Sequence, residues 1–396
     1  MNPPSTLDRA RTHAIRAALV LAALALCLIP SAHTLASPSL SFRSLSSLAT
    51  GWDIQTVDSA GSVGAYSSLA LDDHGFPHVS YYDAANHDLK YARWDGTQWI
   101  VQVADGAGQA GTYSSLALDR NGYPHVSYFY FTQQQVRYAR WDGSQWHFAG
   151  VSNRFWPGIY PSLALDRNDY PHVSYYSNYG TTPPENRLKY RRWDGSQWLN
   201  IVTVDTGSST GQYNALALDG DDRPHISYYD SRNDDLKYAH WDGSQWTTET
   251  VDSGGNVGAY TSLALDGDAR PHISYYDATN GDLKYARWDG SQWRVETVDR
   301  AGQTGRHTSL RLDENGRPHI SYYDGRLRYA HHDGSRWHTE TVDASGDVGA
   351  YSSLAIDAEG RVHIGYYDAT SADLKYAVGA PGSESLVYLP CILNVR

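Results

Sequence analysis

The chain contains little sulfur and no cluster of basic residues. It has two cysteines and one methionine among 396 residues, and only Cys391 lies outside an apolar segment near the N-terminus. A domain with one cysteine has no internal disulfide, so its stability must come from packing. The net charge is −12, and no run of Lys or Arg stands out beyond the N-terminal segment. Because nucleic acids are bound by basic stripes, we expect no nucleic-acid partner.

Motifs of enzymes and of metal sites are also scarce. Beyond the N-terminal segment, the sequence shows no helical periodicity, nucleophile motif, phosphate-binding loop or cluster of metal ligands. This favours a non-catalytic protein with no metal and no cofactor. Calcium remains the alternative, because Asp219, Asp221, Asp222 and Asp268 are carboxylates in expected turns, although their spacing does not form an EF-hand loop.

The N-terminus predicts export. Three arginines precede the apolar run Ala17–Ile29, and small residues allow cleavage after Ala36. This is the plan of a secretory signal, so we expect residues 1–36 to be a signal peptide and residues 37–50 a linker. The mature chain would then be secreted or held at the cell surface, with no membrane insertion after removal of the signal. An uncleaved anchor is the alternative, although the run is short for a membrane span.

One phrase occurs seven times in the rest of the chain. Its middle part reads Pro-His-(Val/Ile)-Ser-Tyr-Tyr-Asp in most copies, and its end reads Trp-Asp-Gly-Ser-Gln-Trp in several. The histidines that mark the period are His78, His125, His172, His225, His272, His319 and His363. A period of 44 to 53 residues predicts a propeller or a solenoid, because one repeat alone cannot bury its apolar faces.

Each copy contains four segments with strand character. In the first copy these are Tyr66–Asp72, Pro77–Asp83, Leu89–Trp94 and Gln98–Val103, and each is rich in β-branched or aromatic residues. The dipeptide Asp95-Gly96 between the last two segments is a tight hairpin signal that recurs in later copies. Four antiparallel strands per copy are typical of a propeller blade.

The two ends of the repeat array complement each other. The Ser/Ala-rich first strand suits the crowded axis, and the Trp-bearing strand is then outermost. The last copy ends at Lys375–Ala377 without a fourth strand, and Trp52–Val57 has the missing sequence. We therefore expect residues 51–379 to form an all-β, seven-bladed β-propeller of four-stranded antiparallel blades, closed by the N-terminal strand. An open solenoid is the alternative, and the apolar tail, residues 380–396, is a separate element.

The repeat histidines are poor candidates for a metal site. On the second strand from the axis they would lie at a radius of roughly 10 Å and about 9 Å from one another. Zinc needs ligands at about 2 Å, so they cannot share one ion. We expect each histidine to be hydrogen-bonded within its own blade.

Departures from the repeat are better guides to function. Before blade three the usual Asp-x-x-Gly-x-x-Gly loop becomes Ser152–Gly158, and inside that blade a short loop grows to Ser177–Asn186. Blade two replaces an acid with Tyr130. Blade six shortens its loop to Asp324-Gly325, which would lower the rim opposite. The strand order places all these loops on one face.

These departures define the predicted binding pocket. Its rim consists of Tyr130, Arg154, Phe155, Trp156, Tyr179 and Glu185. An aromatic ring beside Arg, Glu and amides suits a sugar; the alternative is that Phe155 and Trp156 simply pack under the longer loop. A secondary candidate is Arg306 with His307, which replaces a Tyr found in the other copies and could accept an acidic glycan.

The hairpin phrase resembles known propeller families. Trp-Asp-Gly-Ser-Gln-Trp after an aromatic strand resembles the blades of fucose-specific lectins, in which an Arg and a Glu grip the sugar. The arginines in the matching place are Arg93, Arg140, Arg192 and Arg287, but tyrosines such as Tyr91 stand where the Glu would align. This departure does not support fucose specificity.

A second resemblance is to Asp-box (BNR-like) propellers, which include sialidases. The turns 119–122 and 313–316 resemble shortened Asp boxes, which are structural in that family. The sialidase Arg-Ile-Pro signature is absent from the mature chain.

Three functions remain open. The 31 Tyr and 13 Trp against 6 Phe, together with the lectin-like hairpin and export, favour a non-catalytic glycan-binding propeller. The second reading is a protein-interaction or cell-surface structural propeller whose partner is a surface protein. The third is a glycan-cleaving enzyme, either a glycosidase or a polysaccharide lyase, which would need an acid and a base placed together.

Overall fold

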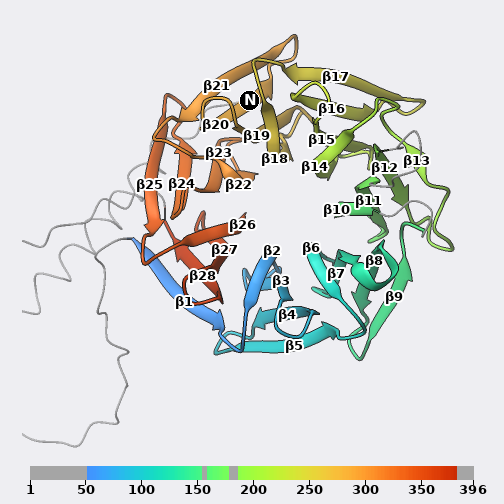
Figure 1. The fold of residues 1–396 in the computed structure, drawn as a ribbon, viewed down its shortest axis with the longest axis vertical. Coiled ribbons are helices and arrows are strands. Elements are labelled where there is room, and N and C mark those ends of the chain that lie inside the picture. The colour runs from blue at the N-terminus through green and yellow to red at the C-terminus, as the bar shows by residue number, and fades with distance from the viewer. Residues whose placement is uncertain (1–50, 154–157, 178–185, 381–396) are drawn as a thin grey trace, which may run out of the picture. The chain divides into compact units, whose positions relative to one another are not determined.

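The structure is a computed structural model that describes residues 51–153, 158–177 and 186–380. Within these ranges the chain forms seven four-stranded antiparallel sheets that follow one another around a central axis (Figure 1). The expected all-β, seven-bladed propeller is therefore confirmed.

Blade one shows the order of strands in every blade. It consists of β2 (Val63–Leu71), β3 (Pro77–Asp83), β4 (Asp88–Trp94) and β5 (Trp99–Asp105), hydrogen-bonded in that order. The first strand of each blade lies nearest the axis, as expected (Figure 1). Strand β2 begins earlier than the sequence predicted, at Val63 instead of Tyr66, because Val63 and Ala65 already pair with β3.

The other blades repeat this plan. Blades two to four contain β6 (Ala110–Leu118), β7 (Pro124–Tyr130), η2 (Phe131–Gln133), β8 (Gln135–Trp141), β9 (Trp146–Gly150), β10 (Gly158–Leu165), β11 (Pro171–Ser177), β12 (Arg187–Arg192), β13 (Val202–Thr203), β14 (Thr210–Leu218), β15 (Pro224–Asp230), β16 (Asp235–Trp241) and β17 (Trp246–Asp252). Blades five to seven contain β18 (Val257–Leu265), β19 (Pro271–Asp277), β20 (Asp282–Trp288), β21 (Trp293–Asp299), β22 (Arg306–Leu312), β23 (Pro318–Tyr323), β24 (Leu327–His332), β25 (Trp337–Asp343), β26 (Val348–Ile356), β27 (Val362–Asp368), β28 (Asp373–Gly379) and β1 (Trp52–Asp58).

Blade seven is closed by the start of the propeller. Strand β1 pairs with β28, with Trp52 opposite Gly379 and Ile54 opposite Ala377. The chain ends of the propeller thus share one sheet, and blade seven has its fourth strand from residues more than 300 positions away. This confirms the predicted closure.

The Asp-Gly hairpins fold locally. The Asp95 carboxylate accepts hydrogen bonds from the backbone N–H groups of Thr97 and Gln98 at 2.8 and 2.9 Å, and Gly96 adopts a φ of 96°. A hydrogen bond from the Thr97 hydroxyl, together with these two backbone bonds, lowers the pKa of Asp95 to about 2. The hairpins lie at one end of the strands, which we call the hairpin face.

The opposite end, the loop face, carries both sets of variable loops. The N–H of Ala84, after β3, donates to the carbonyl of Ser62, before β2, at 2.7 Å. The equivalent bond from Ala369 to Asp347 is 2.8 Å long. The sequence-based placement of both loop sets on one face is thus correct.

The hydrophobic core lies between blades. In one of seven clusters, Leu89 of blade one packs with Val126 and Tyr128 of blade two. Trp146 from the outer strand of blade two contacts Tyr91 of blade one edge-on, with 5.8 Å between ring centroids. Stability therefore depends on how each blade packs on the next.

A buried polar contact reinforces most of these junctions. At the end of β1, Asp58 accepts hydrogen bonds from the Tyr81 hydroxyl, at 2.6 Å, and from the Lys90 ammonium group, both in blade one. We call this Asp–Tyr–cation contact the clasp. Its acids at six junctions are Asp58, Asp105, Asp205, Asp252, Asp299 and Asp343.

Candidate functional site

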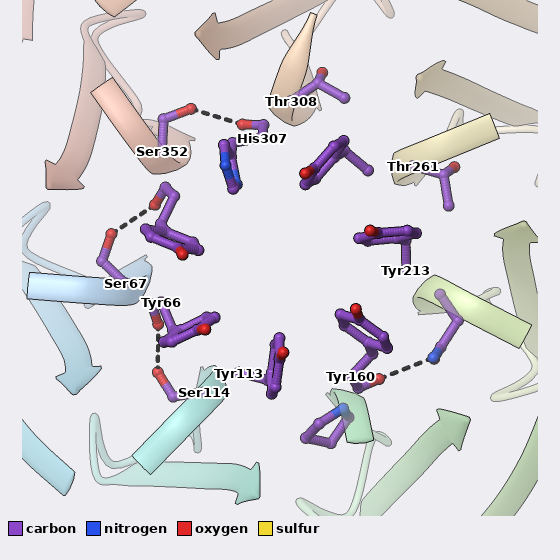
Figure 2. Close-up of a pocket in the computed structure, with 14 residues that line it drawn as sticks. Tyr66, Ser67, Tyr113, Ser114, Tyr160, Tyr213, Thr261, His307, Thr308 and Ser352 are labelled. Carbon is purple, nitrogen blue, oxygen red and sulfur yellow. Dashed lines mark hydrogen bonds between the residues drawn. The ribbon is translucent and has the colours of Figure 1, made fainter. Parts of the chain in front are cut away.

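A circle of aromatic side chains surrounds the axis near the loop face. It takes one residue from the innermost strand of each blade, and we call it the inner ring (Figure 2). Its members are Tyr66, Tyr113, Tyr160, Tyr213, Tyr260, His307 and Tyr351. Neighbouring ring centroids lie 4.4 to 4.7 Å apart around the whole circle.

A bulge in each innermost strand aims the ring residue at the axis. The pairing of β2 with β3 shifts between Ala65 and Ser68, so that Tyr66 and Ser67 fall outside the regular ladder. Tyr66 has a φ of 57°, in the left-handed region, and all seven ring residues have φ between 51 and 57°. For residues other than Gly this conformation costs about 1 kcal/mol or more each, so the surrounding structure must hold it in place.

Hydrogen bonds between blades supply part of that support. The hydroxyl of Ser67 donates to the carbonyl of Tyr351 at 2.7 Å, and the hydroxyl of Ser114 donates to that of Tyr66 at 2.8 Å. In blade four, Asn214 makes the same contact with the carbonyl of Tyr160 (Figure 2). At four of the seven ring positions, a side chain of the following blade thus holds the carbonyl of the ring residue.

The inner ring encloses a cavity. Its volume is about 300 Å³, and its walls are the seven ring residues and the residue that follows each of them. Figure 2 shows the labelled rings standing around an open centre. Small-molecule sites begin at about this volume, so the cavity suits one sugar unit or a group of similar size.

A second circle of aromatic residues, the outer ring, surrounds the first on the loop face. In each blade, its member lies on the second strand, opposite the residue that precedes the inner-ring position on the first strand. The members are Tyr82, Phe129, Tyr176, Tyr229, Tyr276, Tyr323 and Tyr367. The Tyr229 hydroxyl donates to Asp234 at 2.6 Å, and Gln212 donates to the Tyr176 hydroxyl at 3.3 Å. Acids and amides therefore hold the outer phenols around the cavity.

The inner ring carries no charge near neutral pH. Burial, with neighbouring phenols, raises the pKa of Tyr66 and of Tyr113 to about 12, so both hydroxyls stay protonated. Burial, with the Arg306 cation acting in the same direction, lowers the pKa of His307 to about 4. The ring thus offers hydroxyls and an imidazole that both donate and accept hydrogen bonds.

The predicted pocket falls mostly outside the described residues. Arg154, Phe155, Trp156, Tyr179 and Glu185 are not among them, so the pocket remains a prediction.

Tyr130, the sixth residue of that pocket, is described. It is buried at the end of β7, and the guanidinium of Arg137 lies 4.7 Å from its ring centroid. The next residue, Phe131, is 55% exposed and contacts Phe129 of the outer ring edge-on. The loop-face departure in blade two therefore presents an apolar side chain beside the outer ring.

The secondary candidates Arg306 and His307 do lie at the axis. His307 occupies the blade-six position of the inner ring, 4.6 Å from Tyr260 and 4.4 Å from Tyr351 between centroids. Sequence reasoning missed the six tyrosines, because a residue present in every blade was interpreted as structural. The available signal was their place on the innermost strand, where the seven copies of one repeat position must meet around the axis.

The repeat histidines are structural, as predicted. In every blade the histidine Nδ1 lies at hydrogen-bonding distance from a tyrosine hydroxyl on the neighbouring strand, at 2.6 Å for His125 and Tyr138. Burial lowers the pKa of His125 and of His172 to about 4. The imidazoles are therefore neutral, and the phenols donate to them.

Grooves between blades open on the hairpin face. Four of them have volumes of about 420 to 720 Å³ and combine a repeat His and an Arg with a Trp from a hairpin, and three of the four also contain a repeat Tyr. Each groove contains one of the four arginines identified by resemblance to fucose-specific lectins, namely Arg93, Arg140, Arg192 and Arg287. They form a second candidate site, away from the axis.

Over the described ranges, no three His, Cys, Asp or Glu side chains gather closely enough to hold a metal ion. In the same part of the chain, no helix is long and apolar enough to cross a membrane.

Comparison with known proteins finds similarity in fold. No family model and no curated protein matches the sequence. An ulvan lyase of a new polysaccharide lyase family matches 82% of this chain and 96% of its own, with a TM-score of 0.56 and 14% identity. A mutant of AofleA from Arthrobotrys oligospora matches 74% of this chain and 90% of its own, with a TM-score of 0.50 and 12% identity.

A lectin is among the similar structures as well. SapL1, in complex with alpha methyl fucoside, matches 72% of this chain and 98% of its own, with a TM-score of 0.50 and 15% identity. At such identities the similarity concerns the fold, and function has to be argued from the site. The chain thus shares its propeller fold with a lectin and with a polysaccharide lyase.

Proposed function

We propose that the protein binds glycans without cleaving them, and that the inner ring and its cavity form the binding site. The observation that carries the proposal is the neutral circle of six phenols and one imidazole around a cavity of about 300 Å³. Protonated phenols donate and accept hydrogen bonds, as sugar hydroxyls do, and their rings provide apolar contact area.

The composition of the cavity argues for binding over hydrolysis. Glycosidases use two carboxylates about 5 to 10 Å apart. The residues that line the cavity are Tyr, His, Ser, Thr, Asn and Pro, with no Asp or Glu among them. The fold of a fucoside-bound lectin supports the same proposal by analogy.

Export is part of the proposal. A signal peptide at residues 1–36 would deliver the propeller to the cell surface or the medium, where glycans are accessible. The predicted pocket around Trp156 would then extend the site across the loop face.

A glycan array with the purified protein tests the proposal. The ring variant Tyr113→Phe/Tyr213→Phe removes two cavity hydroxyls and keeps both rings, so we expect glycan binding to weaken at least tenfold. The matched control Tyr170→Phe removes a hydroxyl from a groove on the hairpin face and should bind like the wild type.

The other outcomes are equally informative. Loss of binding in Tyr170→Phe alone would move the site to the grooves. Loss in Trp156→Ala/Arg154→Ala alone would move it to the predicted pocket. A wild-type protein that binds no glycan would contradict the proposal and favour the reading as a protein-interaction propeller.

A further inference from the structure

Blade six breaks the sevenfold repeat at the inner ring. Six blades place Tyr at the ring position, and blade six places His307 there. The residue before the ring position is uncharged in the other six blades, whereas in blade six it is Arg306. Both departures fall on adjacent residues of β22, so one side of the cavity differs from the rest.

The guanidinium of Arg306 is held beside the outer ring. Its centre lies 5.5 Å from the ring centroid of Tyr276, and its Nη2 donates to the side-chain oxygen of Gln303 at 2.9 Å. These two contacts fix the group on the loop face at the boundary of blades five and six. A guanidinium has five N–H donors, so most of them are left for a ligand.

The nearby carboxylates already have partners. Asp324 accepts from Arg326 at 2.8 Å and lies 3.8 Å from Arg328, while Asp347 accepts from the Tyr323 hydroxyl at 2.5 Å. Within the described ranges, Arg306 takes part in no ion pair shorter than 4 Å. Its positive charge is therefore not neutralised by the protein.

That charge acts on the cavity. Arg306 lowers the pKa of His307, and it opposes the rise in the pKa of Tyr260 and of Tyr323. Because the inner ring itself is uncharged, the charge of Arg306 makes the electrostatic potential positive on this side of the cavity. The loop after β23 is also short in blade six, since β23 ends at Tyr323 and β24 begins at Leu327, which leaves this side of the rim low.

We propose that Arg306, with His307 and Tyr323 beside it, forms a subsite for the anionic group of an acidic glycan, a carboxylate or a sulfate ester. The inference rests on the proposed glycan binding and adds the class of sugar. Arg matches the geometry of such groups with two parallel N–H bonds, while the neutral imidazole and the phenols remain for the sugar hydroxyls.

The test compares matched glycans by calorimetry at about 0.15 M salt. One pair is a glucuronate-containing oligosaccharide and its carboxyl-reduced form; the other is a sulfated oligosaccharide and its desulfated form. We expect the full-length wild type to bind at least one acidic form roughly 10- to 100-fold more tightly than its neutral partner.

Variants at Arg306 test whether this residue causes the preference for acidic glycans. Arg306→Gln should bind acidic and neutral forms equally, and Arg306→Lys should keep part of the preference because the charge remains. Arg300→Gln removes the same charge from an exposed position on the preceding loop, and it should retain the preference.

Failure of the inference is distinct from failure of the proposed function. Equal wild-type binding of acidic and neutral partners would overturn the inference and leave glycan binding intact. A preference that survives in Arg306→Gln would overturn the assignment to Arg306. Absence of binding to every glycan would overturn both.

Discussion

The junction between blades two and three differs from the other six. Elsewhere a clasp acid at the end of the outer strand accepts a tyrosine hydroxyl and a cation of the next blade, as Asp205 does with Tyr228 and Lys237 at 2.7 and 2.6 Å. Between blades two and three the acid is replaced by Ser152, which accepts the N–H of Val136. Among the described residues, the matching hydroxyl, on Tyr175, is buried without a hydrogen-bond partner.

Another contact takes over at that junction. Arg191 of β12 donates to the carbonyl of Val151 at 2.7 Å and to that of Leu199 at 2.7 Å, and it lies over the ring of Trp198. The residue at the cation position of the clasp, Lys189, donates to the hydroxyl of Thr203 at 2.7 Å, and the contact across this junction comes from Arg191, two residues further along β12. The clasp is therefore a stabilising contact repeated at six junctions, and another arrangement stands in its place before blade three, where the loop sequence departs from the repeat.

Acid should destabilise the feature that all seven blades share. The repeat histidines are neutral in the folded state, with the pKa of His125, His172, His225 and His319 lowered to about 4 by burial. An unfolded histidine has a pKa near 6.5, so between pH 6.5 and 4 the unfolded chain binds more protons and stability falls as pH falls. Each such group lowers the free energy of unfolding by up to about 3 kcal/mol by pH 4, so the four together remove an amount comparable to the usual stability of a domain, roughly 5 to 15 kcal/mol.

We therefore expect the propeller to unfold between pH 6 and 4 at 25 °C, followed by circular dichroism. The turn acids near each histidine, such as Asp166 beside His172, oppose the shift, and Arg192 supports it. His172→Gln should flatten the pH dependence of the free energy of unfolding, and the exposed His74→Gln should leave it unchanged. Constant stability down to pH 4 would show that the histidines are not buried neutral.

Removal of a clasp acid should have the next largest effect. Asp205→Ala leaves the Lys237 ammonium and the Tyr228 hydroxyl buried without their acceptor, which we expect to cost about 3 to 5 kcal/mol in the free energy of unfolding. Ser152→Ala, at the matching position before blade three, should cost only about 1 kcal/mol, because it removes one neutral hydrogen bond. Urea denaturation of both variants measures the contrast, and equal losses would refute the distinction between the junctions.

The features predicted from the sequence are those that depend on local pattern or on repetition. The strands, the Asp-Gly turns and the closure by β1 follow from alternation, turn chemistry and the incomplete last copy. The clasp was missed although its signal was present: in every clasp the acid precedes the tyrosine by 23 positions, as Asp58 precedes Tyr81. The same offset of 23 positions also indicates that Ser152 stands where the other junctions have an acid.

The alternation of residues along a strand could not predict the inner ring. Tyr66 and Ser67 sit in a bulge, where alternation fails, and the left-handed φ of Tyr66 is imposed by neighbouring blades. His307 was identified as a departure from the repeat, but its meeting with six tyrosines is a consequence of ring closure. Local rules thus predict the blade, and the site appears only when seven blades are assembled.

The smallest expected effect comes from removing a single tyrosine hydroxyl at each of the two types of junction. Tyr228→Phe removes a hydroxyl that donates to the Asp205 carboxylate, so it should cost about 1.5 to 3 kcal/mol. Tyr175→Phe removes a buried hydroxyl that has no acceptor in the described part of the chain, so it should be neutral or stabilise the protein by up to about 1 kcal/mol. Both side chains are fully buried in equivalent strands, which cancels the contribution of packing. A loss for Tyr175→Phe as large as that for Tyr228→Phe would mean that blade three has its own acceptor, and the junctions would then differ in sequence but not in energy.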